Sequence, residues 1–182
     1  TMFVDEGDEV KIGQPLFEDK KNPGVIFTSP AGGQIESINR GDRRALQSVV
    51  IEVDQTEESI SFNSYSKDDL QKTSSDKVRS QLVESGLWTS FRTRPYSKIP
   101  SINTSPSNIF ISALDTQPLS PNPEKIINLR NESFNFGLLV LKKFLDCPIH
   151  ISVAENSSIS IKEDDFIKLH TFSGPHPAGL VG

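Results

Sequence analysis

Two short apolar runs at residues 25–27 and 35–38, separated by a tight turn at residues 29–33, restrict the fold more than any other feature of the chain. A proline in this turn favours an extended conformation at the residue before it, and two consecutive glycines can supply the positive φ angles of a chain reversal. A β-branched run at residues 49–53 reads as a further strand. Short strands joined by glycine turns are typical of a small flattened β-barrel, which we predict for residues 1–54.

Residues 55–108 differ from the barrel in composition and are predicted to form a linker and a helical segment. The stretch up to residue 69 is polar and shows no clear periodicity. A Ser-Ser-Asp N-cap ahead of Val78 and a stop signal at Gly86 predict a helix between them. A dense cluster of aromatic and arginine side chains follows this helix: Trp88, Phe91, Arg92 and Arg94.

Residues 109–182 have the pattern of an α/β domain. We predict a strand over residues 109–114, a helix beginning at Asn131, and strands over residues 149–153 and 166–172. A strand, a helix and a strand at this spacing form a βαβ unit, so a parallel sheet with a right-handed crossover is expected. Ligands of such sheets bind beyond the carboxyl ends of the strands.

The composition excludes several classes of function. A net charge of -5 argues against nucleic acid as a partner, because nucleic-acid binding requires a basic face. The single cysteine, Cys147, cannot form an internal disulfide and suits a reducing compartment. No apolar run approaches the ~20 residues of a membrane helix, and no signal segment opens the chain. We therefore expect a protein that is cytosolic or faces the cytosol, and both ends look cut from a longer chain.

The Trp/Arg cluster and one histidine are the candidate contact residues. Aromatic and arginine side chains suit a flat conjugated ring such as a quinone, a partner surface, or simple packing of arginines over aromatic faces, and all three remain open. His176 lies between two prolines at the end of a predicted strand. It could donate a hydrogen bond or a proton to a quinone oxygen, or the prolines could form only a stiff turn.

Other polar residues carry weaker signals. His150 and His170 lie in or near predicted strands and are expected to be structural, because no zinc-like spacing of histidine and cysteine occurs; we predict no metal site. Arg40, Arg43 and Arg44 form the most concentrated basic patch. This patch is either a solvated hairpin or a contact for an anion or a partner.

The acidic and basic residues before the first turn resemble the attachment hairpin of lipoyl and biotinyl domains. In those domains a lysine beside an acidic residue is modified and swings between active sites. Here Asn22-Pro23-Gly24 lengthens the hairpin and Lys21 adjoins the candidate Lys20. We expect the same barrel used as a scaffold, with a carrier domain modified at Lys20 as the alternative.

Three separated segments, residues 7–53, 81–100 and 174–182, resemble the A subunit of the sodium-translocating NADH:quinone oxidoreductase of bacteria. The resemblance spans essentially the whole chain. It implies a barrel-sandwich β domain followed by part of a Rossmann-like α/β domain. It also implies a protein without transmembrane helices on the cytoplasmic face of the inner membrane, bound to the other subunits of the complex and associated with its quinone end.

The same resemblance implies that this chain carries no redox cofactor of its own. Ubiquinone would be a substrate of the complex, while FMN, FAD, riboflavin and iron–sulfur clusters would belong to other subunits. The complex is an NADH:ubiquinone reductase that exports sodium, and we expect the chain to have no activity by itself.

A more distant resemblance links residues 85–98 to the glycine-rich loop of the NADH- and FMN-binding subunit of proton-pumping complex I. Such loops work because bare backbone N–H groups approach phosphates closely. Here Trp88, Phe91, Arg92 and Arg94 occupy the segment, with no glycine after Gly86 until the segment ends. We interpret this as a nucleotide fold that has lost its flavin and NADH site; a flavin- or NADH-binding electron-transfer subunit is the alternative.

Overall fold

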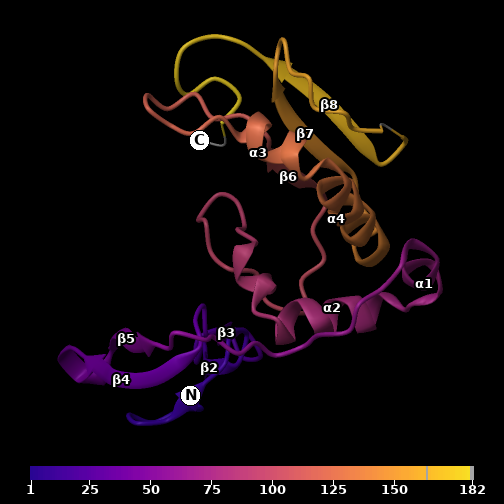
Figure 1. Ribbon diagram of the computed structural model, residues 1–182. Coiled ribbons are helices and arrows are strands. Elements are labelled where there is room, and N and C mark those ends of the chain that lie inside the picture. Colours follow the sequence, from indigo (N-terminus) through magenta and orange to yellow (C-terminus); the bar gives the residue numbers. More distant parts are fainter. Residues whose placement is uncertain (163, 181–182) are drawn as a thin grey trace. The chain divides into compact units, whose positions relative to one another are not determined.

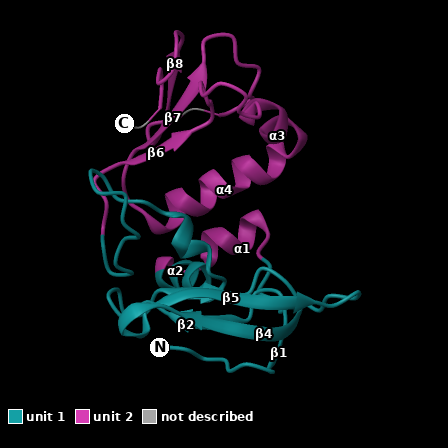
Figure 2. Cartoon of the chain, turned by 90° about the vertical axis from the view of Figure 1, so that its left-hand side faces the viewer, with its two compact units in different colours: residues 1–64, 76–104 teal, residues 65–75, 105–182 magenta. Residues whose placement is uncertain are grey.

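The computed structural model describes residues 1–162 and 164–180 and divides the chain into two compact units. Unit 1 comprises Thr1–Ser64 and Asp76–Thr104, drawn in teal in Figure 2. Unit 2 comprises Tyr65–Ser75 and Ser105–Gly182, drawn in magenta. The predicted middle region, residues 55–108, is therefore shared between the two units.

Unit 1 is built on short antiparallel strands, as the glycine turns predict (Figure 1). One sheet has the order β1-β4-β5, and β2 pairs with β3. A small apolar core holds Val4, Val10, Leu16 and Ile35. The strands are β1 (Glu9–Val10), β2 (Pro15–Glu18), β3 (Ile26–Thr28), β4 (Gly33–Arg40) and β5 (Leu46–Val53), with a 3-10 turn, η1 (Asp42–Arg44), between the last two.

In the turn at residues 29–33, one of the two glycines has the positive φ angle that the sequence predicts. Gly33 has a φ of 151°, and a Cβ atom there would overlap the backbone carbonyl of Glu52 on β5. Ser29 is buried, and its hydroxyl donates to the carbonyl of Ala31 at 2.6 Å. Only glycine permits β4 to enter the sheet at this distance from β5.

The remainder of unit 1 folds back on the barrel strands. Helix α2 (Ser75–Glu84) is followed by a 3-10 turn, η2 (Leu87–Ser90), and the two are separated by the predicted stop at Gly86. Gly86 is left-handed, with a φ of 75°, and a side chain there would overlap Thr28 on β3. Helix α2 therefore ends where its backbone approaches the barrel closely.

Unit 2 contains the predicted parallel sheet, in the order β6-β7-β8. Its longest helix, α4, begins at the predicted residue. Two short helices were not predicted, although both begin at recognisable caps: a capping box between Ser66 and Asp69, and Asn122 followed by proline. The elements are α1 (Lys67–Lys72), β6 (Ile109–Ser112), α3 (Pro123–Leu129), α4 (Asn131–Phe144), β7 (Ile149–Ala154) and β8 (Ile167–Phe172).

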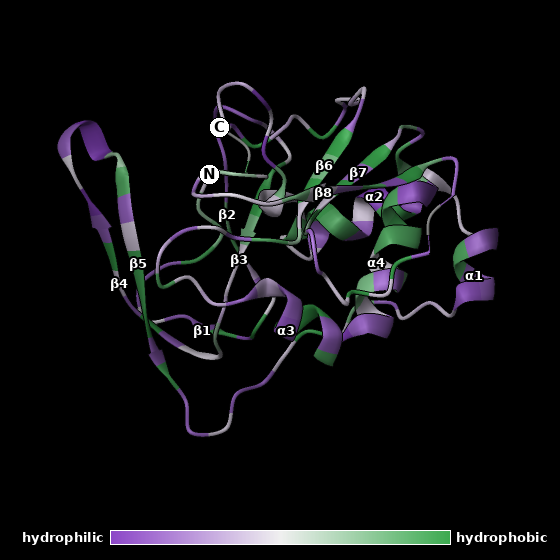
Figure 3. Cartoon of the chain, turned by 90° about the horizontal axis from the view of Figure 1, so that it is seen from above, coloured by the Kyte–Doolittle hydropathy of each residue, from purple (hydrophilic) through white to green (hydrophobic). Residues whose placement is uncertain are grey.

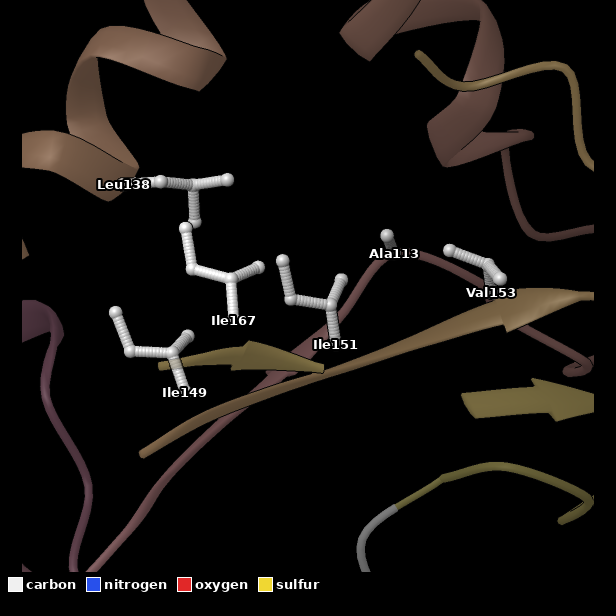
Figure 4. Packing of buried hydrophobic residues seen from close by; sticks show 6 residues of the cluster. All are labelled: Ala113, Leu138, Ile149, Ile151, Val153 and Ile167. Atoms are coloured by element: carbon white, nitrogen blue, oxygen red, sulfur yellow. The ribbon is translucent and has the colours of Figure 1, made fainter. Parts of the chain in front are cut away.

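The core of unit 2 lies on one face of this sheet. Alternate residues of β7 are fully buried there, and Leu138 of α4 packs against them (Figure 4). Each such side chain contributes roughly 1.5–3 kcal/mol on burial, so this layer stabilises the unit. The cluster consists of Ala113, Leu138, Ile149, Ile151, Val153 and Ile167. The opposite face, which carries Phe110, is exposed.

Candidate functional site

Trp88, the centre of the predicted contact cluster, lies in η2 and is buried, with 2% of its surface exposed. Its indole Nε1 donates to the carbonyl of Pro100 at 2.9 Å. Its ring meets Phe91 edge to face, with centroids 5.3 Å apart. Because the one donor of the indole is used inside unit 1, Trp88 acts here as a packing residue.

The segment that accepts this hydrogen bond is tied to two other parts of unit 1. The amide Nδ2 of Asn22, in the turn between β2 and β3, lies 3.0 Å from the carbonyls of both Ile99 and Pro100. On α2, Arg79 donates to the carbonyl of Ile102 at 2.7 Å. Trp88 is thus part of a network that joins the barrel, α2 and residues 99–102.

The two arginines of the cluster are exposed, unlike Trp88. The guanidinium of Arg92 donates to the backbone carbonyls of Thr89 and Phe91 at the end of η2. Arg92 therefore caps this turn, in the manner of basic residues at helix C-termini. Arg94 lies in a loop that is closed by a 2.7 Å bond from the backbone N–H of Thr93 to the carbonyl of Lys98.

The predicted ligand-binding edge of the parallel sheet brings distant residues together. Thr116, which follows β6, lies 3.4 Å from Nδ1 of His176, which follows β8, and its hydroxyl also approaches the carbonyl of Ala178 at 3.3 Å. His176 is exposed. The loop after β8 packs tightly, since a Cβ atom at Gly179 would lie 2.9 Å from Phe172. The last two residues of the predicted motif, 181 and 182, lie outside the described residues.

A carboxylate stands beside this histidine. Asp115 accepts hydrogen bonds from the hydroxyl of Ser120 at 2.6 Å and from the backbone N–H of Gln117 at 2.9 Å. These bonds, with a smaller contribution from His176, hold the pKa of Asp115 below its ordinary value. The edge therefore presents an anion, a hydroxyl and an imidazole, which together can hydrogen-bond a polar ligand.

A second polar cluster was not predicted as a site. On the exposed face of the sheet, Nδ1 of His150 lies 2.9 Å from Nε2 of His170, and Nε2 of His150 lies 3.1 Å from Oδ1 of Asn108. Phe110 stacks on His150 with centroids 5.2 Å apart. An amide oxygen only accepts, so His150 carries its proton on Nε2 when neutral. Strand alternation indicates the shared face, but the pairing of β7 with β8 was needed to bring the histidines together.

Lys20, the alternative attachment residue, is exposed in the turn between β2 and β3. The backbone of this turn is fixed on both sides: the N–H of Lys21 donates to Asp19 at 2.8 Å, and that of Gly24 donates to Glu18 at 2.7 Å.

Among the described residues, no group of three or more histidine, cysteine, aspartate or glutamate side chains could hold a metal ion.

Comparison with known proteins agrees with the two-part architecture. The family model of the NqrA N-terminal barrel-sandwich hybrid domain matches residues 1–54, and that of the NqrA second alpha/beta domain matches residues 73–182. The chain belongs to the NqrA family. The predicted order of a barrel-sandwich domain followed by an α/β domain is thereby confirmed.

Several NqrA relatives match the chain from end to end. A protein of Yersinia pseudotuberculosis is 52% identical over 182 residues, covering 100% of this chain and 40% of its own length. Proteins of Histophilus somni and Haemophilus influenzae are 50% and 51% identical, each covered over 41% of its length. All three are named as the A subunit of a Na(+)-translocating NADH-quinone reductase. The chain spans about 40% of the length of these relatives.

In the part of the chain that the structure describes, no helix has both the length and the apolar character required to cross a membrane.

Proposed function

We propose that this chain serves in a sodium-translocating NADH–quinone reductase as part of its NqrA component. The observation that carries the proposal is the 52% identity to the Yersinia pseudotuberculosis protein across all 182 residues. In this role the chain is a peripheral component on the cytoplasmic face of the bacterial inner membrane, and it binds the other subunits of the complex.

Within that complex we assign the chain a supporting role without a redox cofactor. In the segment that resembles a glycine-rich loop, Gly86 lies against Thr28 and Trp88 is buried. A glycine-rich loop binds phosphate through N–H groups that no side chain covers, whereas bulky side chains follow Gly86 in this segment. NADH, FMN, FAD, riboflavin and the iron–sulfur clusters are then bound by other subunits, and the isolated chain is inactive.

Contact with ubiquinone or with a neighbouring subunit is assigned to exposed residues. Among the five predicted contact residues, Arg92, Arg94 and His176 are exposed, Phe91 is half-buried and Trp88 is buried. His176 has the strongest chemical case, because its imidazole can donate to a quinone carbonyl while Asp115 supplies a nearby negative charge. Within unit 1, Trp88 supports Phe91 and Arg92 indirectly through its packing.

A chimeric NqrA tests the proposal. Residues 1–182 of this chain would replace the matching segment of the Yersinia pseudotuberculosis protein in cells that lack their own copy. We expect the chimera to co-purify with the remaining subunits and to restore sodium-dependent NADH–quinone reductase activity in membranes. A chimera that is expressed and folded but neither co-purifies nor restores activity would contradict the assignment.

The assignment of His176 needs its own measurement. In the chimera, His176→Ala should weaken binding of a quinone analogue and raise the KM for quinone, while NADH oxidation with an artificial acceptor stays unchanged. The matched control is His170→Ala, which removes an exposed histidine from another part of the same unit. Equal quinone affinity in the wild-type and His176→Ala complexes would remove His176 from the quinone site.

A further inference from the structure

The β4–β5 hairpin continues beyond the sheet as a two-stranded arm. In the described residues, β1 pairs with Gly33 and Gln34, and the outer residues of β4 have β5 as their one neighbouring strand. Residues 39–48 are exposed apart from Gly41 and Leu46, which are half-buried. Figure 3 shows β4 and β5 as a narrow hairpin whose closed end is hydrophilic. We call residues 40–44 the arm tip.

The arm tip has one defined backbone conformation. The N–H of Gly41 donates to the carbonyl of Ala45 at 2.8 Å, and the N–H of Arg44 donates back to the carbonyl of Gly41 at 3.0 Å. Arg43 and Arg44 both have positive φ angles, 54° and 60°. L-residues other than asparagine, aspartate and glycine rarely adopt this conformation, and such outliers concentrate at ligand-binding and switch regions.

The charge of the arm tip is opposite to that of the chain. Three arginines and one aspartate give the tip a net charge of +2, whereas the whole chain carries -5. Arg40, Arg43 and Arg44 are exposed, and within the described ranges none of them forms a salt bridge. Two adjacent arginines therefore occupy disfavoured backbone positions without an internal ion pair that would explain them.

We propose that the arm tip is a docking element for carboxylate groups on the surface of another protein subunit. This rests on the proposed function, which supplies the partner: a neighbouring subunit of the reductase with an acidic patch. All three basic residues are arginines, whose planar guanidinium pairs with a carboxylate through two parallel hydrogen bonds. The hydrogen bonds of the tip fix its backbone in advance, and the guanidinium of Arg40 donates to the carbonyl of Arg44 at 3.4 Å. A preformed backbone lowers the entropy lost on binding.

A protein surface fits the arm tip better than a lipid bilayer does. Interfacial membrane elements combine basic side chains with exposed large apolar ones that insert between the headgroups. The exposed large hydrophobic side chains of this chain all lie outside residues 39–48 in the described ranges. Electrostatic attraction by three arginines alone gives weak membrane affinity.

The first experiment uses the 182-residue chain and poly-L-glutamate, so it does not depend on the reductase. The key variant is Arg43→Asn with Arg44→Asn, because asparagine tolerates the left-handed conformation. We expect salt-sensitive binding by the wild type, an about tenfold loss in the double variant, and a midpoint of thermal unfolding no lower than wild type. The matched control is Lys20→Gln with Lys21→Gln, which removes two exposed charges elsewhere in unit 1 and should bind within about twofold of wild type.

The second experiment measures binding of the chimeric NqrA to washed membranes that contain the other reductase subunits but lack NqrA. The same double variant should lose about tenfold in affinity, and Arg43→Lys with Arg44→Lys should recover only part of it. Failure of the wild-type chimera to bind would refute the proposed function, whereas the poly-L-glutamate result would stand separately. Unchanged binding by the asparagine variant in either experiment overturns the docking proposal. Equal binding of the wild type to protein-free vesicles of anionic lipid would assign the tip to the membrane instead.

Discussion

Two aromatic clusters, one in each unit, differ in what surrounds them. In unit 1, Trp88 is 2% exposed, and its indole N–H is bonded to Pro100. In unit 2, Phe110 is 62% exposed and stacks on His150, which in turn contacts His170. Trp88, the aromatic residue with the more obvious ligand-binding chemistry, is enclosed, whereas Phe110, which carried no such signal, is open to solvent.

The difference teaches that residue type alone does not separate packing from recognition. A tryptophan flanked by arginines suits a binding site, but the same side chains also close a small core when a carbonyl lies within reach. Parallel sheets usually have both faces covered, so an exposed Phe110 on such a sheet is the more informative anomaly.

The largest expected effect is the loss of Trp88. Trp88→Ala removes a buried aromatic side chain, and we expect the free energy of unfolding of unit 1 to fall by about 3–5 kcal/mol. Urea denaturation followed by far-UV circular dichroism would measure the change. A fall of less than about 1 kcal/mol would mean that Trp88 contributes little to packing. The Trp88 and Phe110 clusters would then not differ in their contribution to stability.

A smaller effect isolates the hydrogen bond to Pro100. Trp88→Phe keeps an aromatic ring but removes the indole N–H and some volume, so we expect unit 1 to lose about 1–3 kcal/mol. Trp88 is the single tryptophan, so wild-type fluorescence should be blue-shifted and poorly quenched by iodide in the folded state. Fluorescence typical of a solvated indole would contradict the burial on which this prediction rests.

Substitution in the exposed cluster of Phe110, His150 and His170 should change stability far less than substitution of Trp88. Phe110→Ala removes a side chain that is mostly solvated, so we expect the stability of unit 2 to change by no more than about 0.5 kcal/mol. Its control is Ile151→Ala on the opposite face of the sheet, where loss of a buried side chain should cost about 2–5 kcal/mol. Comparable losses in the two variants would show that the two faces of the sheet are equally packed.

The smallest effect concerns an ion pair at the surface of unit 2. Lys142 lies 2.5 Å from Asp164, and this bond lowers the pKa of the Asp164 carboxyl. Because the pKa of this carboxyl is lower in the folded state, the ionised Asp164 stabilises the fold at pH values above the ordinary carboxyl pKa. This stabilisation is lost as the pH falls through the lowered pKa. In Asp164→Asn, the free energy of unfolding should therefore fall slightly less steeply at acidic pH than in the wild type. In 1 M salt this difference in slope between the variant and the wild type should be smaller. The same pH dependence of the free energy of unfolding in the variant and the wild type would show that the ion pair does not form in solution.

The sequence was sufficient for features fixed by local chemistry. The turn before Gly33 and the stop at Gly86 follow from backbone geometry, and both were predicted. The start of α4 at Asn131 was also predicted, although no side chain caps the helix there. The capping box at the start of α1 is a sequence signal for a helix, but the polar residues around it indicated a linker. The chain's membership of the NqrA family came from three long motifs and not from physical reasoning.

The candidate sites could not be resolved from the sequence because they depend on long-range contacts. Burial of Trp88 requires residues 99–102 to fold back on the barrel, and no local sequence pattern predicts this contact. His150 and His170 are 20 residues apart and meet only through the pairing of β7 with β8. The encounter of Thr116 with His176 was more accessible, since carboxyl ends of parallel strands share one edge of a sheet.

The bond between Asn22 and residues 99–100 has a consequence for how this barrel differs from the carrier domains it resembles. A carrier must present its hairpin as an independent, mobile element that visits several partners. Here the corresponding hairpin is bonded to chain that comes 77 residues later, so displacing it would open the cover over Trp88. The turn that carries Lys20 is thereby anchored within its own unit, in contrast to the freely presented hairpin of a carrier domain.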